Sequence, residues 1–220
     1  MVGCKMKEIC DFLSFIGQGI GITLLLLIGS LTIGLVFGGV IALCRYYDKC
    51  IWFITRYISI LRGTPMMLQL SLIYFVLPNL LHVNLDVLTA GIIAFGLNSS
   101  AYVAEIFRAG IEAVPKGQFL AAKSLRIPNF YIWKDIIMPQ VIKNIGPALV
   151  NEAVTLAKDT AMISILGGMD VMRRAQIISS EHFTYFLPLC IAALYYYLLV
   201  YAIEIGAKYI GICRKSDLIN

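Results

Sequence analysis

Charge is scarce in this sequence. Asp, Glu, Lys and Arg make up 14% of its 220 residues, whereas soluble domains carry about 25%. Hydrophobic residues account for 60%, and the mean hydropathy is +0.83. A chain with so few charges cannot cover a surface that faces water. The sequence therefore predicts an all-α integral membrane protein, because helices satisfy their own backbone hydrogen bonds in lipid.

Several chemical signatures are also absent from the sequence. It contains no HExxH pair, no GxSxG elbow and no cluster of His and Cys ligands, which argues against a membrane-embedded enzyme and a metal site. It contains no G-x-x-x-x-G-K-[ST] phosphate loop, so we expect no cofactor on this chain and no ATP hydrolysis by it. The six cysteines form no CxxC pair and are expected to be free thiols.

Long apolar runs are what the sequence has instead. They predict about five membrane spans, at residues 15–44, 63–81, 87–107, 141–168 and 183–203. In the first span, Gly34, Gly38 and Gly39 recur at near-helical spacing and predict close approach of another helix.

The distribution of Lys and Arg predicts the orientation of these spans. With five spans, four such residues lie on one side: Lys5, Lys7, Arg173 and Arg174. Thirteen lie on the other: Arg45, Lys49, Arg56, Arg62, Arg108, Lys116, Lys123, Arg126, Lys134, Lys143, Lys208, Arg214 and Lys215. The N-terminal segment 1–14 is therefore expected outside, and the tail 210–220 and segment 117–140 in the cytoplasm.

Segment 117–140, GQFLAAKSLRIPNFYIWKDIIMPQ, is too elaborate for a simple connection. Its first part favours a helix from Gln118 to Leu125, which Ile127-Pro128 ends because a residue before proline avoids the helical region. Asn129 is the expected N-cap of a second short helix. The apolar face of that helix is predicted to hold Phe130, Trp133 and Ile137, and Pro139 marks the entry to the fourth span.

Residue chemistry alone leaves two hypotheses for this segment. One is a helix pair that lies in the lipid headgroup region, anchored by Trp133 and Lys134. The other is a docking helix that a cytoplasmic protein grips in a groove.

Polar residues inside the spans are candidates for a substrate path. Charged groups in a membrane are costly and usually face a partner or a watery cavity. The candidates are Asn98, Glu152, Lys158 and Asp159. Thr160 and Gly167-Gly168 predict a locally broken helix after them. A structural polar network between helices is the alternative for these residues.

Two further polar groups lie near the predicted cytoplasmic ends of the spans. Glu105 and Arg108 are spaced for an intrahelical ion pair. Arg62 and Thr64 open the second span, where Thr64 is a candidate cap.

Four ordered motifs resemble the polar amino acid permeases (histidine, glutamine and arginine type) of ATP-binding-cassette (ABC) importers. They are RGTPMMLQLSLIYF (62–75), AYVAEIFRAGIEAVPKGQ (101–118), the 117–140 segment and NEAVTLAKDTAMISILG (151–167). The resemblance covers about residues 15–209 and implies a type-1 importer permease fold with a cytoplasmic EAA-type coupling loop. Within the family, glutamine permeases are the most similar. A gate role for Arg62 is implied by this resemblance alone.

The resemblance also implies partners and site residues. It implies a separate ATPase that uses the ATP, an external solute-binding protein, and a second permease copy or a similar permease, in the cell inner membrane. The residues it places in the coupling loop are Gln118, Ala121, Ala122, Leu125, Arg126, Pro128, Trp133 and Pro139. This chain departs from the family pattern at two positions, with Leu120 in place of Glu and Arg126 in place of Gly. Either Arg126 adopts a left-handed turn at a cost of about 1–2 kcal/mol, or Pro128 sets the bend.

The predicted function is therefore the permease subunit of an ABC importer for polar amino acids, glutamine among them. The alternative is an ATP-independent channel or secondary carrier for a small polar solute. That alternative explains the charges in the membrane but not the elaborate 117–140 segment.

Overall fold

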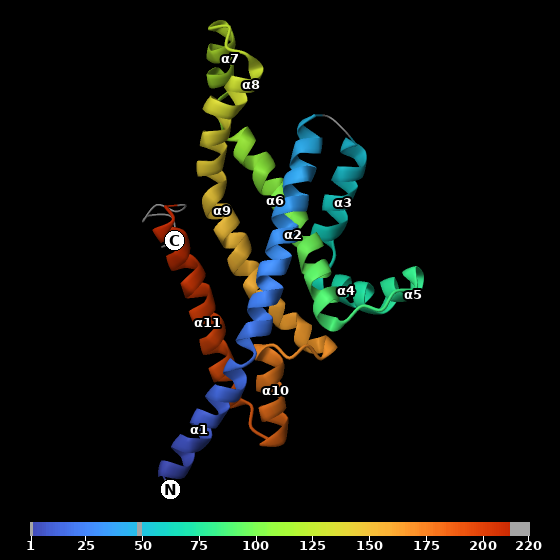
Figure 1. The fold of residues 1–220 in the computed structure, drawn as a ribbon, viewed down its shortest axis with the longest axis vertical. Helices are drawn as coiled ribbons and strands as arrows, with labels where there is room; N and C mark the ends of the chain where they lie inside the picture. Colours follow the sequence, from blue (N-terminus) through green and yellow to red (C-terminus); the bar gives the residue numbers. More distant parts are fainter. Residues whose placement is uncertain (1, 48–49, 212–220) are drawn as a thin grey trace.

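The computed structural model describes residues 2–47 and 50–211, and these form an elongated bundle of helices (Figure 1). Three helical stretches in this part of the chain are long and apolar enough to cross a membrane, or four if one bent helix pair counts as a span. The sequence predicted five. Helix α9, in the predicted fourth span, is not among these candidates, and charged residues interrupt its apolar sequence.

The first predicted span lies in a long helical stretch that is interrupted near its start. Helix α1 (Val2–Gly17) is followed by α2 (Ile20–Tyr46), and α1 lies against the C-terminal helices (Figure 1). A Cβ atom at Gly19 would lie 2.5 Å from the backbone of Asp170, so the break needs a glycine. The predicted division between an N-terminal segment 1–14 and the membrane domain therefore falls inside helix α1.

Helices α2 and α6 (Val87–Glu112) form the central contact of the bundle. A Cβ atom at Gly34 would lie 2.6 Å from Ser99 Oγ, and one at Gly38 would lie 2.7 Å from Val103. The predicted close approach is therefore confirmed at these two glycines. At Gly39 a Cβ atom would meet nothing within 4 Å.

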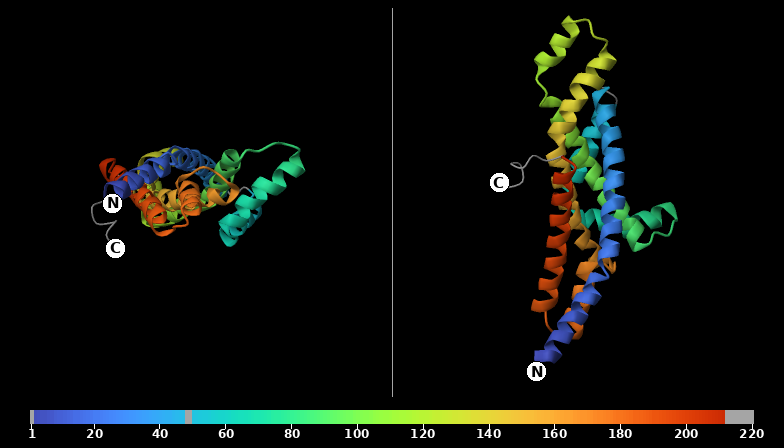
Figure 2. Two further views of the ribbon diagram at one scale, coloured as in Figure 1. Left: turned by 90° about the horizontal axis from the view of Figure 1, so that it is seen from below. Right: turned by 60° about the vertical axis from the view of Figure 1, so that its left-hand side comes forward.

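The predicted second span, residues 63–81, is wrong in both its start and its shape. Helix α3 (Ile51–Gly63) runs back along α2 and α6. The chain then bends by 106° into an arm made of α4 (Met66–Ser71), the π-helix η1 (Leu72–Val76) and α5 (Leu77–Leu81). Figures 1 and 2 show this arm projecting sideways from the bundle. Because the returning helix begins at residue 51, Arg62 lies at the far end of α3 rather than beside the α2–α3 connection.

The 117–140 segment forms a helical hairpin at one end of the molecule. It contains α7 (Lys116–Ser124), α8 (Asn129–Tyr131) and the π-helix η2 (Ile132–Ile137), which continues directly into α9 (Met138–Asp159). The hairpin extends beyond the ends of α2 and α3 (Figures 1 and 2).

The last part of the chain begins at the helix break that the sequence predicted. Helix α9 gives way to the 3₁₀ helix η3 (Thr160–Leu166), which ends at Gly167 with a left-handed φ of 85°. Helices α10 (Val171–Glu181) and α11 (Phe186–Tyr209) complete the fold. Of the predicted tail 210–220, residues 212–220 lie outside the described residues.

Candidate coupling and translocation sites

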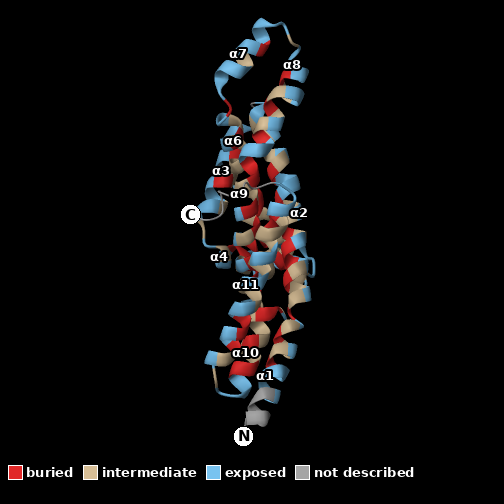
Figure 3. Ribbon diagram, turned by 90° about the vertical axis from the view of Figure 1, so that its left-hand side faces the viewer, coloured by how far each residue is buried: buried red, intermediate tan, exposed pale blue. Residues whose placement is uncertain are grey.

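The hairpin of α7, α8 and η2 has a small apolar core of its own. Ala122 of α7 and Ile132 and Ile137 of η2 are buried together with Val141 and Ile145 of α9. Outside this base most of the hairpin surface is exposed (Figure 3). The hairpin is thus a folded projection with a defined shape, which is what a docking element requires.

Arg126 forms the turn of the hairpin. Its φ is 58°, in the left-handed region that costs a non-glycine residue about 1–2 kcal/mol. The N–H groups of Arg126 and Ile127 donate to the carbonyls of Lys123 and Ala122, at 2.8 and 3.2 Å, and close the end of α7. Of the two alternatives for the bend, the structure shows the left-handed Arg126.

The second half of the hairpin departs from the predicted pattern. Pro128, not Asn129, precedes the first helical residue of α8, and no side chain caps this helix. The predicted apolar face is wrong at Phe130, which is 68% exposed, while Ile132 is fully buried. The π-helix η2 explains the shift, because its wider turn moves the buried face out of α-helical register. Pro139 lies in the first turn of α9, as predicted.

Apolar side chains are exposed near the tip of the hairpin. Leu120, Leu125 and Phe130 are 62%, 75% and 68% exposed. Ala121 and Pro128 are exposed beside them. At the base, Gln118 Oε1 accepts a hydrogen bond from Gln140 Nε2 at 3.3 Å, which joins the two arms of the hairpin. The residues predicted for the coupling loop therefore lie in one element, with Ala122 in its core and Leu125 on its surface.

Trp133 faces the rest of the bundle. Its ring is half-buried and meets Tyr46, at the end of α2, edge-on with ring centroids 4.4 Å apart. Phe119 of α7 lies on another side, with centroids 6.5 Å apart. Trp133 is therefore an internal contact between hairpin and bundle, which counts against its predicted role as an anchor in the headgroup layer.

Two amides hold the bend between α3 and α4. Gln69 Nε2 lies 2.7 Å from the carbonyl oxygen of Leu61, 3.1 Å from that of Thr64 and 2.8 Å from Thr64 Oγ1. Leu61 belongs to the last turn of α3, where helix carbonyls have no partner in their own helix, and Thr64 is the extended residue that follows the helix. Asn98 Nδ2 donates to Leu61 O at 3.2 Å and to Gln69 Oε1 at 3.0 Å.

This arrangement changes two sequence-based interpretations. Asn98, a candidate for the substrate path, binds the bend and so acts as a structural contact between helices. Thr64 does not cap the following helix, because its hydroxyl donates backward to Ile60 O at 2.8 Å. Gln69, which the sequence did not single out, is the central residue of the bend.

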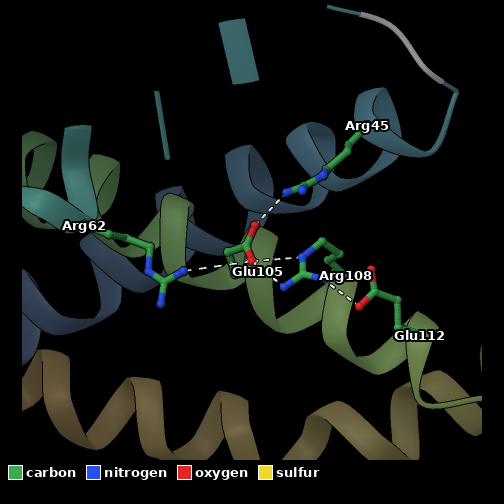
Figure 4. A network of polar contacts seen from close by, with 5 residues as sticks. All are labelled: Arg45, Arg62, Glu105, Arg108 and Glu112. Carbon is green, nitrogen blue, oxygen red and sulfur yellow. Dashed lines mark hydrogen bonds and ion pairs between the residues drawn. The ribbon is translucent and has the colours of Figure 1, made fainter. Parts of the chain in front are cut away.

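Glu105 and four other charged residues, from three helices, form one cluster (Figure 4). The predicted Glu105–Arg108 pair is confirmed at 2.8 Å. Arg45 of α2 lies 2.6 Å from the same carboxylate, Arg62 of α3 lies 3.9 Å from it, and Arg108 also pairs with Glu112 at 2.6 Å. The sequence did not predict Arg45 and Arg62 here, because the path of α3 was not recognised.

A polar face runs along α9. Asn144, Asn151, Thr155 and Lys158 are exposed, at helical spacings of seven, four and three residues. Glu152 points elsewhere, since its Oε1 accepts from Ser99 Oγ of α6 at 2.7 Å. Asp159 is half-buried at the end of the helix. Of the four predicted path residues, Lys158 thus lies on this face, whereas Asn98 and Glu152 are engaged in contacts between helices.

The comparison with protein families decides what this bundle is. The model described as "Binding-protein-dependent transport system inner membrane component" matches residues 30–211. The chain belongs to this family. Its members are membrane components of transport systems rather than enzymes, and they are located in the inner membrane.

Individual relatives and one solved structure agree with this assignment. A Rickettsia typhi protein, named provisionally as a glutamine transport system permease, is 50% identical over 208 residues, 94% of each chain. The Bacillus subtilis arginine transport system permease is 44% identical over 205 residues, 92% of this chain and 94% of that one. A crystal structure of an amino acid ABC transporter with histidines matches with a TM-score of 0.83 and 38% identity, over 92% of this chain and 95% of that chain. The fold is therefore that of a type-1 ABC importer permease.

Proposed function

We propose that this chain is the permease subunit of an ABC importer for polar amino acids, with glutamine as the first candidate substrate. It forms the path across the membrane, and a separate ATPase subunit supplies the energy. The observation that carries this proposal is the α7–α8 hairpin, a folded projection with its own core and exposed leucines at its tip. The names of the relatives, which specify glutamine and arginine transport, support the substrate class.

The ATPase docks on the hairpin tip. Leu120, Leu125 and Phe130 supply apolar contacts of the kind a groove accepts from a short helix. Leu120 replaces the family's Glu, so the ATPase surface opposite it is expected to be less charged. With the ATPase on this side, we expect the hairpin and the tail in the cytoplasm and the N-terminus outside.

The polar face of α9 lines the path. This face does not suit contact with lipid, because polar groups in a bilayer face protein or water. Its exposed residues are Asn144, Asn151, Thr155 and Lys158. A second permease, either another copy of this chain or a similar one, covers this face and completes the path. An external solute-binding protein delivers the amino acid to it.

Reconstitution tests the proposal directly. The permease, its ATPase and its solute-binding protein are placed in proteoliposomes, and uptake of radiolabelled L-glutamine is measured with and without ATP. We expect uptake that needs ATP and all three proteins. Uptake by the purified permease alone, driven by an ion gradient, would instead support the ATP-independent carrier and overturn the proposal.

A further inference from the structure

Among the described residues, the charged cluster around Glu105 contains three arginines and two glutamates. Arg45 and Arg108 hold the Glu105 carboxylate at 2.6 and 2.8 Å, and Arg108 also binds Glu112. Arg62 is the outlying member, at 3.9 Å from Glu105 Oε2, which is too far for a hydrogen bond. Figure 4 shows its guanidinium approaching Glu105 from the opposite side to Arg108. The surplus positive charge of the cluster is therefore located on Arg62.

The position of Arg62 makes this surplus costly. Its neighbour Leu61 is bonded to Asn98, which lies in the middle of the membrane-length helix α6. The guanidinium lies over the ring of Tyr102, 5.1 Å from its centroid, and the side chain is 44% exposed. A cation beside a membrane-length helix usually faces an anion or a water-filled cavity. The exposed side of Arg62 leaves room for an anion.

A cavity of about 420 Å³ lies beside Arg62. Its polar lining includes Arg62, Tyr102, Glu105, Arg108 and Asn144. The volume falls in the range of small-molecule sites, about 300–1,000 Å³.

The same cavity continues the polar face of α9. Asn144 and Ala148 line it, and Asn151, Thr155 and Lys158 follow Ala148 along the same side of the helix. The cavity is therefore the end of this face nearest the α7–α8 hairpin.

We propose that Arg62 binds the α-carboxylate of the transported amino acid in this cavity, on the hairpin side of the path. This inference rests on the proposed function. The guanidinium offers paired N–H donors that match a carboxylate, and the Tyr102 ring holds it in place. Asn144 offers an amide oxygen to the α-amino group. The site recognises the part that all amino acids share, so the side chain of the substrate does not affect its contact with Arg62.

Binding to the purified full-length permease tests the site without ATPase or solute-binding protein. The protein is placed in phosphatidylcholine nanodiscs, and L-glutamine is titrated by saturation-transfer-difference NMR. We expect Arg62→Gln to weaken binding about tenfold, the effect of losing one charged hydrogen-bonded contact. Arg62→Lys should retain part of it. The α-amide of L-glutamine, which lacks the carboxylate, should bind wild-type protein as weakly as L-glutamine binds Arg62→Gln.

Arg56→Gln is the matched control. Arg56 is an exposed arginine on the same helix whose guanidinium lies over Trp52, outside the cavity. It should bind L-glutamine within about twofold of wild type. Circular dichroism checks that each variant is folded, and if Arg62→Gln is not, the comparison of L-glutamine with its α-amide on wild-type protein decides.

Three results would overturn the site: equal binding by wild type and Arg62→Gln, equal binding of L-glutamine and its α-amide, or loss of binding when phosphatidylglycerol is added. The last would assign the cavity to a lipid phosphate. If the reconstituted importer takes up L-glutamine while these results hold, the site is refuted and the proposed function stands. If the reconstituted importer shows no ATP-driven uptake of L-glutamine, the proposed function itself is refuted.

Discussion

Two sharp bends in this molecule are built in opposite ways. The turn between α7 and α8 depends on backbone geometry, with Arg126 in a left-handed conformation, and leaves leucines exposed around it. The bend between α3 and α4 depends on side chains, because Gln69 and Asn98 satisfy the open carbonyls of α3. The first bend leaves an apolar surface exposed, which is the docking surface in the proposed function. The second bend uses its polar groups in hydrogen bonds within the molecule. Substitutions at the two bends should therefore affect different measurements.

Removal of the exposed leucines should produce the largest effect. We expect the double substitution Leu120→Ser with Leu125→Ser to weaken ATPase association about a hundredfold, roughly 2.7 kcal/mol, because docking contacts of this kind concentrate in a few apolar residues. Copurification and a binding titration measure it. The thermal midpoint of the permease itself should hardly change, since both side chains are exposed.

Leu80→Ser is the control for that pair. Leu80 is 71% exposed, close to the 75% of Leu125, but lies on α5, in the arm that follows the other bend. It should leave ATPase association intact. Equal loss of association with Leu80→Ser would show that the effect is not specific to the hairpin.

Loss of the amide at the second bend should affect stability instead. Gln69→Ala removes the donor to the Thr64 carbonyl and leaves the Leu61 carbonyl with Asn98 alone, and we expect a loss of about 2 kcal/mol in the free energy of unfolding. Thermal unfolding in detergent measures this. Asn79→Ala, which removes an exposed bond to Phe75 O in the same arm, should cost less than about 0.5 kcal/mol. Similar losses from the two substitutions would contradict the role given to Gln69.

The smallest effect, and the only stabilising one, is expected at the turn itself. Arg126→Gly relieves the strain of a positive φ but adds freedom to the unfolded chain, so the net gain should be about 1 kcal/mol or less. Lys123→Gly places the same residue inside helix α7 and should destabilise by roughly 0.7 kcal/mol. If Arg126→Gly lowers the unfolding temperature, its side chain contributes more than its backbone costs.

The two bends also show how far the sequence could predict this structure. The first was within reach, because Gln118 to Leu125 favours helix locally and Ile127-Pro128 ends it. The second was not, because it depends on Gln69 and Asn98, which are 29 residues apart in sequence. Arg56 and Arg62 also made residues 51–63 resemble a polar connection, so the start of the returning helix was missed.

The two candidate sites differ in the same way, because one is contiguous in sequence and the other is not. The hairpin residues were predicted together because they are contiguous, although the π-helix η2 displaced Phe130 from the buried face. The path residues come from several helices, so their grouping required the structure. Asn98 and Glu152 proved to be bonded to other helices, whereas Arg62 and Asn144 joined the cavity.

Helices α8, η2 and α9 follow one another without a gap from Asn129 to Asp159. These 31 residues act as a lever arm of about 45 Å, so a tilt of about 5° at one end displaces the other by about 4 Å. Pro139 and Pro147 both lie within this lever and have no N–H to donate to the preceding turn, so its backbone hydrogen bonding is interrupted at these two points. In the proposed importer, a tilt of the hairpin of this size would displace Lys158 by about 4 Å.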